Sequence, residues 1–73
     1  MELNTHQELM KVREFLKQYA IIVYTGSPLD DIVLMDLELE DLYEDKHLEA
    51  SEYTKFKLAL RRAYSELENG RQR

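Results

Sequence analysis

The sequence predicts an all-α fold: a single-domain, antiparallel three-helix bundle. Its 73 residues suffice for one domain at most, and 44% of them are hydrophobic, which is enough for a core. Apolar side chains recur at three- and four-residue spacing in three segments, a period typical of helices with one buried face. The connections between the segments are short, and short connections favour an up-down-up arrangement of neighbouring helices.

The first helix is predicted over about residues 5–20. Thr5 and Glu8 have the spacing of a capping box, in which a hydroxyl and a carboxylate satisfy early backbone amides. The buried face is expected to comprise Leu9, Val12, Leu16, Tyr19 and Val23, with Phe15 beside them. Whether residues 20–25 are helical or extended stays open, because most of them are β-branched or aromatic. Gly26 fits the C′ position of this helix, and the segment before it is expected to be a buried connector.

The second helix is predicted over about residues 28–45. Ser27 is a good N-cap, Pro28 fits the first helical position, and Asp30 and Asp31 face the positive end of the helix dipole. The core stripe is expected to comprise Ile32, Met35, Leu39, Leu42 and Tyr43. At 100° per residue, a second apolar stripe falls on nearly the opposite side: Val33, Leu34 and Leu37.

The third helix is predicted over about residues 50–69, with Gly70 as its stop and residues 70–73 as a frayed tail. Its buried seam is expected to comprise Tyr53, Phe56, Leu60, Ala63 and Leu67. Leu58 points away from that seam and lies among basic residues.

The net charge of −5 conceals an uneven distribution. Residues 1–29 are neutral, residues 30–52 carry ten acidic side chains against one basic, and residues 53–73 carry six basic against two acidic. The second helix is therefore acidic and the third is basic, and in a compact bundle the two can face each other. Whether the basic face of the third helix is free or paired with the acidic helix stays open from the sequence alone.

No catalytic, cofactor-binding or metal-binding residues are predicted, and we expect a protein that is not an enzyme. Glu44 and His47 have the i, i+3 spacing of a metal pair, but di-iron bundles need two such motifs and two further glutamates. Two glycines are too few for the common phosphate-binding loops, and the acidic run lacks the glycine turn of a calcium loop. The absence of cysteine, of a signal segment and of a long apolar run indicates a cytoplasmic protein without membrane contact.

Among the sequence features, the second apolar stripe of the middle helix bears most directly on function. If the first connector leaves it uncovered, we expect a protein interface formed by Val33, Leu34, Leu37 and Leu58; the open alternative is that the connector covers the stripe entirely. Exposed apolar patches usually mark a partner surface, and small domains gain stability by self-association. The sequence thus favours a small helical interaction module that binds a protein partner or forms a homodimer.

A set of short motifs resembles the YqgQ-like family of short bacterial proteins. They are Tyr24-Thr25-Gly26, Asp31-Ile32, Leu34-Met35, Glu38-Leu39 and Leu42-Tyr43, within a layout that covers roughly residues 9–64. The resemblance implies an intracellular three-helix bundle with no known enzymatic activity, and single-stranded nucleic-acid binding has been suggested for such proteins. This chain departs from the pattern at Ser27, Pro28 and Glu40, where many members carry basic residues.

The alternative function is therefore binding of single-stranded nucleic acid through the third helix and the Tyr24-Thr25-Gly26 turn. Basic side chains can follow a phosphate backbone while aromatic rings stack on bases. The candidate contacts are Tyr24, Thr25, Lys55, Lys57, Arg61 and Arg62. The acidic segment beside them weakens the field that would attract a polyanion.

Overall fold

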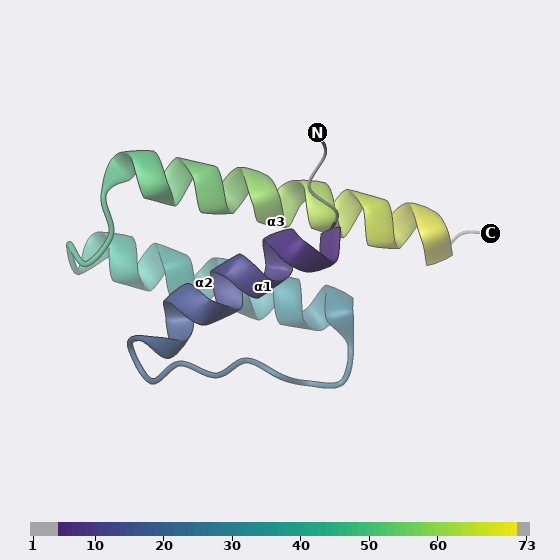
Figure 1. The fold of residues 1–73 in the computed structure, drawn as a ribbon, viewed down its shortest axis with the longest axis horizontal. Coiled ribbons are helices and arrows are strands. Elements are labelled where there is room, and N and C mark those ends of the chain that lie inside the picture. Colours follow the sequence, from purple (N-terminus) through teal and green to yellow (C-terminus); the bar gives the residue numbers. More distant parts are fainter. Residues whose placement is uncertain (1–4, 72–73) are drawn as a thin grey trace.

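The structure, a computed structural model, describes the backbone of residues 5–71 and the side chains of residues 5–69. Figure 1 shows three helices joined by two connectors: α1 spans Thr5–Lys17, α2 spans Pro28–Glu44 and α3 spans Ala50–Arg71. The predicted all-α three-helix fold is confirmed. The start of α2 follows its sequence signals, because the Oγ of Ser27 accepts from the amide of Asp30 and Pro28 occupies the first turn.

The direction of the helices departs from a strict up-down-up order at the first connection. Glu8 pairs with Arg62 and Phe15 lies against Phe56, so α1 runs antiparallel to α3. Figure 1 shows that α2 is also antiparallel to α3, while residues 18–27 cross back along the molecule, so that α1 and α2 begin at the same end. A connector of ten residues spans at most about 30 Å, and its extended part carries the chain back along the bundle.

α1 ends earlier than the sequence predicts. Its last residue is Lys17, whereas the predicted boundary lies near residue 20, and the turn that follows is a Schellman motif. The amide of Ala20 donates to the carbonyl of Lys17 at 2.9 Å, and the amide of Ile21 donates to that of Leu16 at 3.1 Å. Ala20 holds the required positive φ of 61°, so it takes the C′ role that the sequence had assigned to Gly26.

The first connector is extended over residues 21–25, as its β-branched composition allows. Its side chains alternate: Ile21 and Val23 pack against the core, whereas Ile22 and Tyr24 are exposed. The expectation of a buried connector therefore holds for one of its two faces only, because successive residues of an extended chain point to opposite sides.

Two more residues with positive φ mark the other chain reversals. Gly26, at φ 91°, makes the turn before α2. Lys46, at φ 67°, ends α2 in a second Schellman motif, in which the amide of His47 donates to the carbonyl of Leu42 at 2.9 Å. Neither Ala20 nor Lys46 is a residue type that announces such a turn in a sequence.

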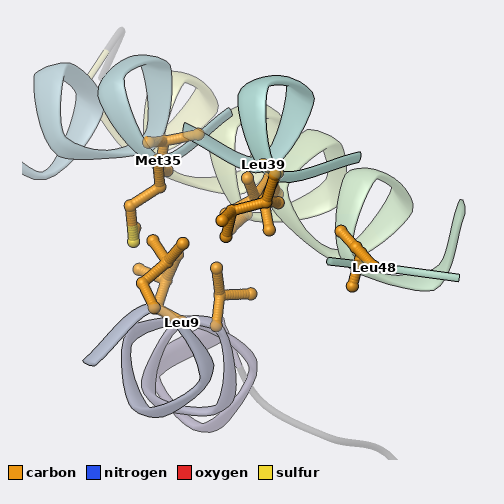
Figure 2. Packing of buried hydrophobic residues seen from close by; sticks show 10 residues of the cluster. Leu9, Met35, Leu39 and Leu48 are labelled. Atoms are coloured by element: carbon orange, nitrogen blue, oxygen red, sulfur yellow. The ribbon is translucent and has the colours of Figure 1, made fainter. Parts of the chain in front are cut away.

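The core lies between the three helices and is sealed at one end by Leu48 of the second connector. Figure 2 shows side chains from α1 meeting those of α2, with Leu9 on one side and Met35 and Leu39 on the other. The buried cluster comprises Leu9, Val12, Leu16, Ile32, Met35, Leu39, Leu42, Leu48, Leu60 and Ala63. The predicted stripes supply all of it except Leu48. Tyr19 and Tyr43, which the stripes included, remain exposed at the end where α2 turns into α3.

The last helix continues past its expected stop. α3 passes through Gly70 and ends at Arg71, whereas the sequence places residues 70–73 in a frayed tail. A glycine inside a helix costs about 1 kcal/mol but does not forbid it, and helix ends are uncertain by one or two residues. Residues 72–73 lie outside the described part of the chain. No helix between residues 5 and 71 combines the length and apolar character that a bilayer crossing needs.

Candidate interaction surfaces

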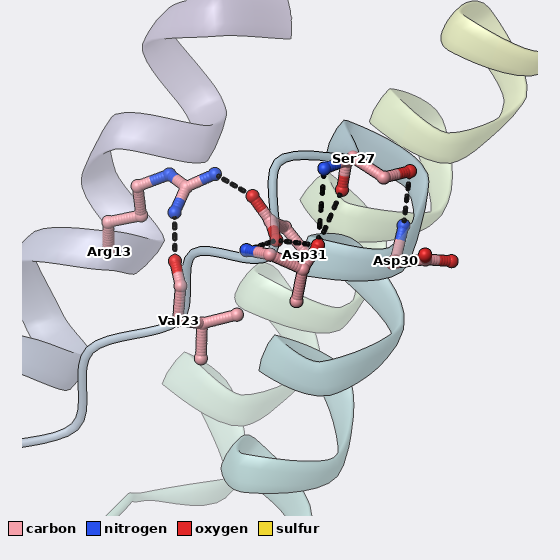
Figure 3. A network of polar contacts seen from close by, with 6 residues as sticks. Arg13, Val23, Ser27, Asp30 and Asp31 are labelled. Carbon is pink, nitrogen blue, oxygen red and sulfur yellow. Dashed lines mark hydrogen bonds and ion pairs between the residues drawn. The ribbon is translucent and has the colours of Figure 1, made fainter.

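A partly buried polar cluster, centred on the buried Asp31, fixes the first connector to the helices (Figure 3). Asp31, in the first turn of α2, is 2% exposed. Its Oδ1 accepts from both the amide and the hydroxyl of Thr25 at 2.7 Å, and its Oδ2 lies 2.9 Å from Nη2 of Arg13. The Nη1 of Arg13 donates to the carbonyl of Val23. One arginine of α1 and one aspartate of α2 therefore hold the extended segment between them.

This cluster determines the ionisation of Asp31. Burial alone would raise the pKa of its carboxyl group, but hydrogen bonds from Thr25 and Arg13 outweigh burial and lower that pKa below its usual value. Asp31 is thus a buried carboxylate whose two oxygens both have hydrogen-bond partners, and its charge is stabilised by Thr25 and Arg13 as well as by the dipole of α2. Thr25, a predicted nucleic-acid contact, uses both its amide and its hydroxyl in this cluster.

The side of α2 that faces away from the core carries an uncovered apolar patch, called here the outer face. Its members are Val33, Leu34 and Leu37, which are 48%, 41% and 51% exposed. They are exposed because Ile32 and Met35, on the opposite side of the helix, are the residues that enter the core. The alternative that the connector covers this stripe entirely is therefore wrong.

Acidic side chains surround the outer face. Asp30 and Glu38 flank Leu34 at four residues on either side, and Asp41 follows Leu37 at the same spacing, which places each beside its leucine on the helix surface. No basic residue occurs anywhere in α2. Within the described residues, Asp30, Glu38 and Asp41 form no ion pair with a basic side chain.

The seam between α2 and α3 is held by Lys57. Its Nζ lies 2.8 Å from both Oδ1 of Asp36 and Oε2 of Glu40, and 5.3 Å from the centre of the Tyr53 ring. Burial would lower the pKa of Lys57, but the bonds to Asp36 and Glu40 raise it well above its usual value. The sequence left open whether the basic face of α3 is free or paired with the acidic helix. For Lys57, the structure shows pairing with the acidic helix α2.

The seam between α1 and α3 contains a second ion pair. The buried carboxylate of Glu8 accepts from Nη2 of Arg62 at 2.6 Å, and the hydroxyl of Thr5 donates to Glu66. Both side chains of the predicted Thr5–Glu8 capping box thus have partners on α3, because α3 runs alongside the start of α1. The side chain of Arg62 remains 65% exposed.

Above that seam lies a hollow of about 300 Å³ with an apolar floor and a basic rim, called here the basic hollow. Its lining residues are Glu8, Lys11, Lys55, Phe56, Leu58, Ala59 and Arg62. Leu58 is 50% exposed and marks the outer edge of the apolar part. Lys11 and Lys55 are exposed, and neither belongs to an ion pair within the described residues.

The structure separates residues that the sequence grouped together. Leu58 lies in the hollow between α1 and α3, whereas Val33 lines the groove between α2 and α3, so the predicted interface is two surfaces rather than one. The predicted nucleic-acid contacts are also divided. Tyr24, 81% exposed, lies on the connector, which Figure 1 shows beyond α1 and α2 on the side away from α3.

Comparison with protein families gives a match over residues 7–66, which include most of α1, all of α2 and most of α3. The matching model is that of the YqgQ-like family. The chain belongs to the YqgQ-like family. Comparisons with curated proteins and with solved structures find no similar chain.

In this YqgQ-like chain, Asp31 and two residues of the Tyr24-Thr25-Gly26 motif, Thr25 and Gly26, have a structural explanation. Thr25 bonds to Asp31, and Gly26 supplies the positive φ that turns the chain into α2. The partner that sequence reasoning missed is Arg13. Its position outside the apolar stripe of α1 gave no sign that it would reach across to α2.

The described residues of the YqgQ-like chain contain no group of three metal-ligand side chains. Glu44 and His47 line a wide, open hollow of about 770 Å³ at the second connector. The ring of His47 lies 5.4 Å from that of Tyr19, whose hydroxyl donates to the carbonyl of His47. His47 thus helps to join the end of α1 to the end of α2.

Proposed function

We propose that this YqgQ-like chain is a non-enzymatic cytoplasmic interaction module that binds protein, including further copies of itself, through the outer face of α2. The observation that carries the proposal is the exposure of Val33, Leu34 and Leu37 on two adjacent turns of one helix. Contiguous apolar patches of this kind mark binding surfaces in small proteins. The absence of cysteine is in keeping with a reducing compartment.

The stability of a small domain supports self-association. A chain of this size buries only about 60% of the surface that its unfolded form exposes, so its folded state has little stability in reserve. Covering the outer face with another copy removes further apolar surface from water, at about 25 cal/mol per Å². A second copy is also the partner that is always present wherever the chain is made.

Binding of single-stranded nucleic acid has weaker support. Lys57 is engaged by Asp36 and Glu40, and Arg62 is engaged by Glu8. Of the six predicted contacts, Lys55 and Arg61 are the exposed cations left without an ion pair in the described chain, and the exposed ring of Tyr24 lies on a different element from them. A strand of nucleic acid needs charge and stacking platforms along one path.

Sedimentation velocity over micromolar concentrations tests the proposal. The purified chain is expected to sediment increasingly fast as its concentration rises, and Leu37→Glu is expected to abolish that increase by placing a charge within the outer face. Ile22→Glu is the matched control, because Ile22 is exposed on the connector and receives the same new charge away from α2. A wild-type chain that sediments as a monomer throughout would contradict self-association.

A further inference from the structure

We propose that copies of the chain associate head to tail, with the outer face of α2 of one copy seated in the basic hollow between α1 and α3 of the next. This inference rests on the proposed function and adds to it the partner surface. The occupant of the basic hollow is a second copy of this chain.

Charge complementarity is the first argument. The apolar residues Leu34 and Leu37 are flanked by Asp30, Glu38 and Asp41, with no basic residue on the helix. The hollow has the opposite arrangement, in which an apolar floor lies beneath a basic rim. That rim comprises Lys11, Lys55 and Arg62, and the one acid in the lining, Glu8, is buried and paired with Arg62. The two surfaces therefore match in both their apolar centres and their charged margins, which favours this pairing and its register.

The same charges disfavour a symmetric dimer through α2. A two-fold contact would place the outer face against its own copy, which brings Asp30, Glu38 and Asp41 of both copies together. Like charges opposed across an interface cost free energy and select against that pairing. A symmetric contact through the basic hollow would oppose Lys11, Lys55 and Arg62 in the same way.

The shape of the hollow supports the same pairing. The lining combines the short side chain of Ala59 with the larger Phe56 and Leu58, and the recess of about 300 Å³ can receive aliphatic side chains from a neighbouring helix. Leu34 and Leu37 project from successive turns of α2, the spacing with which a helix enters a groove. Arg62 is exposed enough to bind a second carboxylate while it retains Glu8.

The two surfaces belong to different sides of the bundle, because one lies on α2 and the other between α1 and α3. A contact between unlike surfaces leaves one free surface of each kind on every pair, so association continues beyond the dimer unless a ring closes. Exposed ion pairs at the rim make the contact sensitive to salt.

A mixing experiment tests the inference. Leu37→Glu damages the outer face and leaves the hollow, whereas Leu58→Glu damages the hollow and leaves the outer face. Each variant alone is expected to associate at least about tenfold more weakly than the wild type, while an equimolar mixture is expected to form a one-to-one complex that does not grow. Lys55→Glu, at an exposed residue of the rim, replaces Leu58→Glu if circular dichroism shows that the latter does not fold.

Each result has a distinct meaning. A one-to-one complex from two weakly associating variants supports head-to-tail pairing. Wild-type association that Leu58→Glu and Lys55→Glu leave unchanged overturns the inference but leaves the proposed function standing, as does a mixture that stays monomeric. A wild-type chain that is monomeric up to about 1 mM, where even millimolar affinity would be detected, contradicts this inference and the self-association in the proposed function together.

Discussion

Arg13 of α1 and Asp31 of α2 are joined by an ion pair of 2.9 Å between Nη2 and Oδ2, across the path of the connector that links their helices. The same two side chains bind the backbone of that connector at Val23 and Thr25. This arrangement explains how the extended part of a ten-residue connector is held in one path without pairing as a strand, and it also sets the position at which α2 begins.

Replacing Arg13 with methionine is expected to destabilise the fold by about 1–3 kcal/mol, since the buried carboxylate of Asp31 loses its cation. Urea unfolding followed by circular dichroism measures the change. Lys11→Met is the matched control, because Lys11 is exposed on the same helix and belongs to no ion pair in the described chain. Equal effects of the two substitutions would show that the Arg13–Asp31 contact does not hold the connector.

Asp31 also predicts a dependence of stability on pH. Its pKa is lower in the folded chain than in the unfolded chain, where it is about 3.9, so the ionised form stabilises the fold above that value. This contribution is lost as the pH falls through the lowered pKa. In unfolding measured from about pH 5 to pH 2, the wild type is therefore expected to lose more stability than Asp31→Asn. Parallel losses in the two proteins would contradict this account.

The end of α1 offers a test of backbone strain. Ala20 adopts φ 61°, a left-handed conformation that costs an ordinary residue about 1–2 kcal/mol. Ala20→Gly is expected to stabilise the fold by about 0.5–1 kcal/mol, after the greater flexibility of glycine in the unfolded chain is subtracted. Thermal unfolding measures this gain as a higher Tm.

A substitution in the opposite direction at another residue with positive φ, Gly26→Ala, provides the control for Ala20→Gly. Gly26 has φ 91°, and an added Cβ would meet no atom within 4 Å, so Gly26→Ala isolates the cost of the conformation from any steric clash. It is expected to lower stability by about 1 kcal/mol. If Ala20→Gly lowers the Tm as Gly26→Ala does, the Schellman turn at Ala20 is not the conformation that ends α1.

Fluorescence anisotropy with labelled single-stranded oligonucleotides tests the alternative function. We expect no binding at about 50 mM salt, where phosphate contacts are strongest, because Lys57 and Arg62 already serve acidic partners within the chain. Binding that weakens steeply with added salt would favour the alternative. Lys55→Glu and Tyr24→Ala would then show which surface is responsible.

Periodicity predicted the helices and nearly all of the core, because burial of one helix face depends on spacing that a sequence displays directly. Leu60, for instance, was expected in the seam of α3 and is 1% exposed. The path of the connector was not predictable in the same way. It depends on Ala20 adopting a positive φ and on Arg13 reaching Asp31, and neither residue type indicates such a role.

The candidate surfaces could be predicted only in part, because spacing along one helix does not determine how the helices pack. Helical spacing shows that Leu37 and Leu58 each lie opposite the buried face of their own helix, and both are exposed. It does not show how the helices are placed around the core, so the sequence grouped into one interface residues that occupy two surfaces. The opposite charges of α2 and α3 made an ion pair such as that of Lys57 with two acids predictable. The ion pair of Glu8 with Arg62 was not predictable in this way, because it requires α1 to lie antiparallel to α3.

The central claim, that the outer face of α2 binds protein, is tested most directly by NMR of the ¹⁵N-labelled chain at rising concentration. From roughly 20 µM to 1 mM, a range that brackets weak association, the amide signals of Val33, Leu34 and Leu37 are expected to shift, together with those of Lys55 and Leu58. The signal of Ile22, exposed on the connector, is expected to stay in place. Signals of the outer face that do not move over this range, or shifts confined to the connector, would contradict the claim.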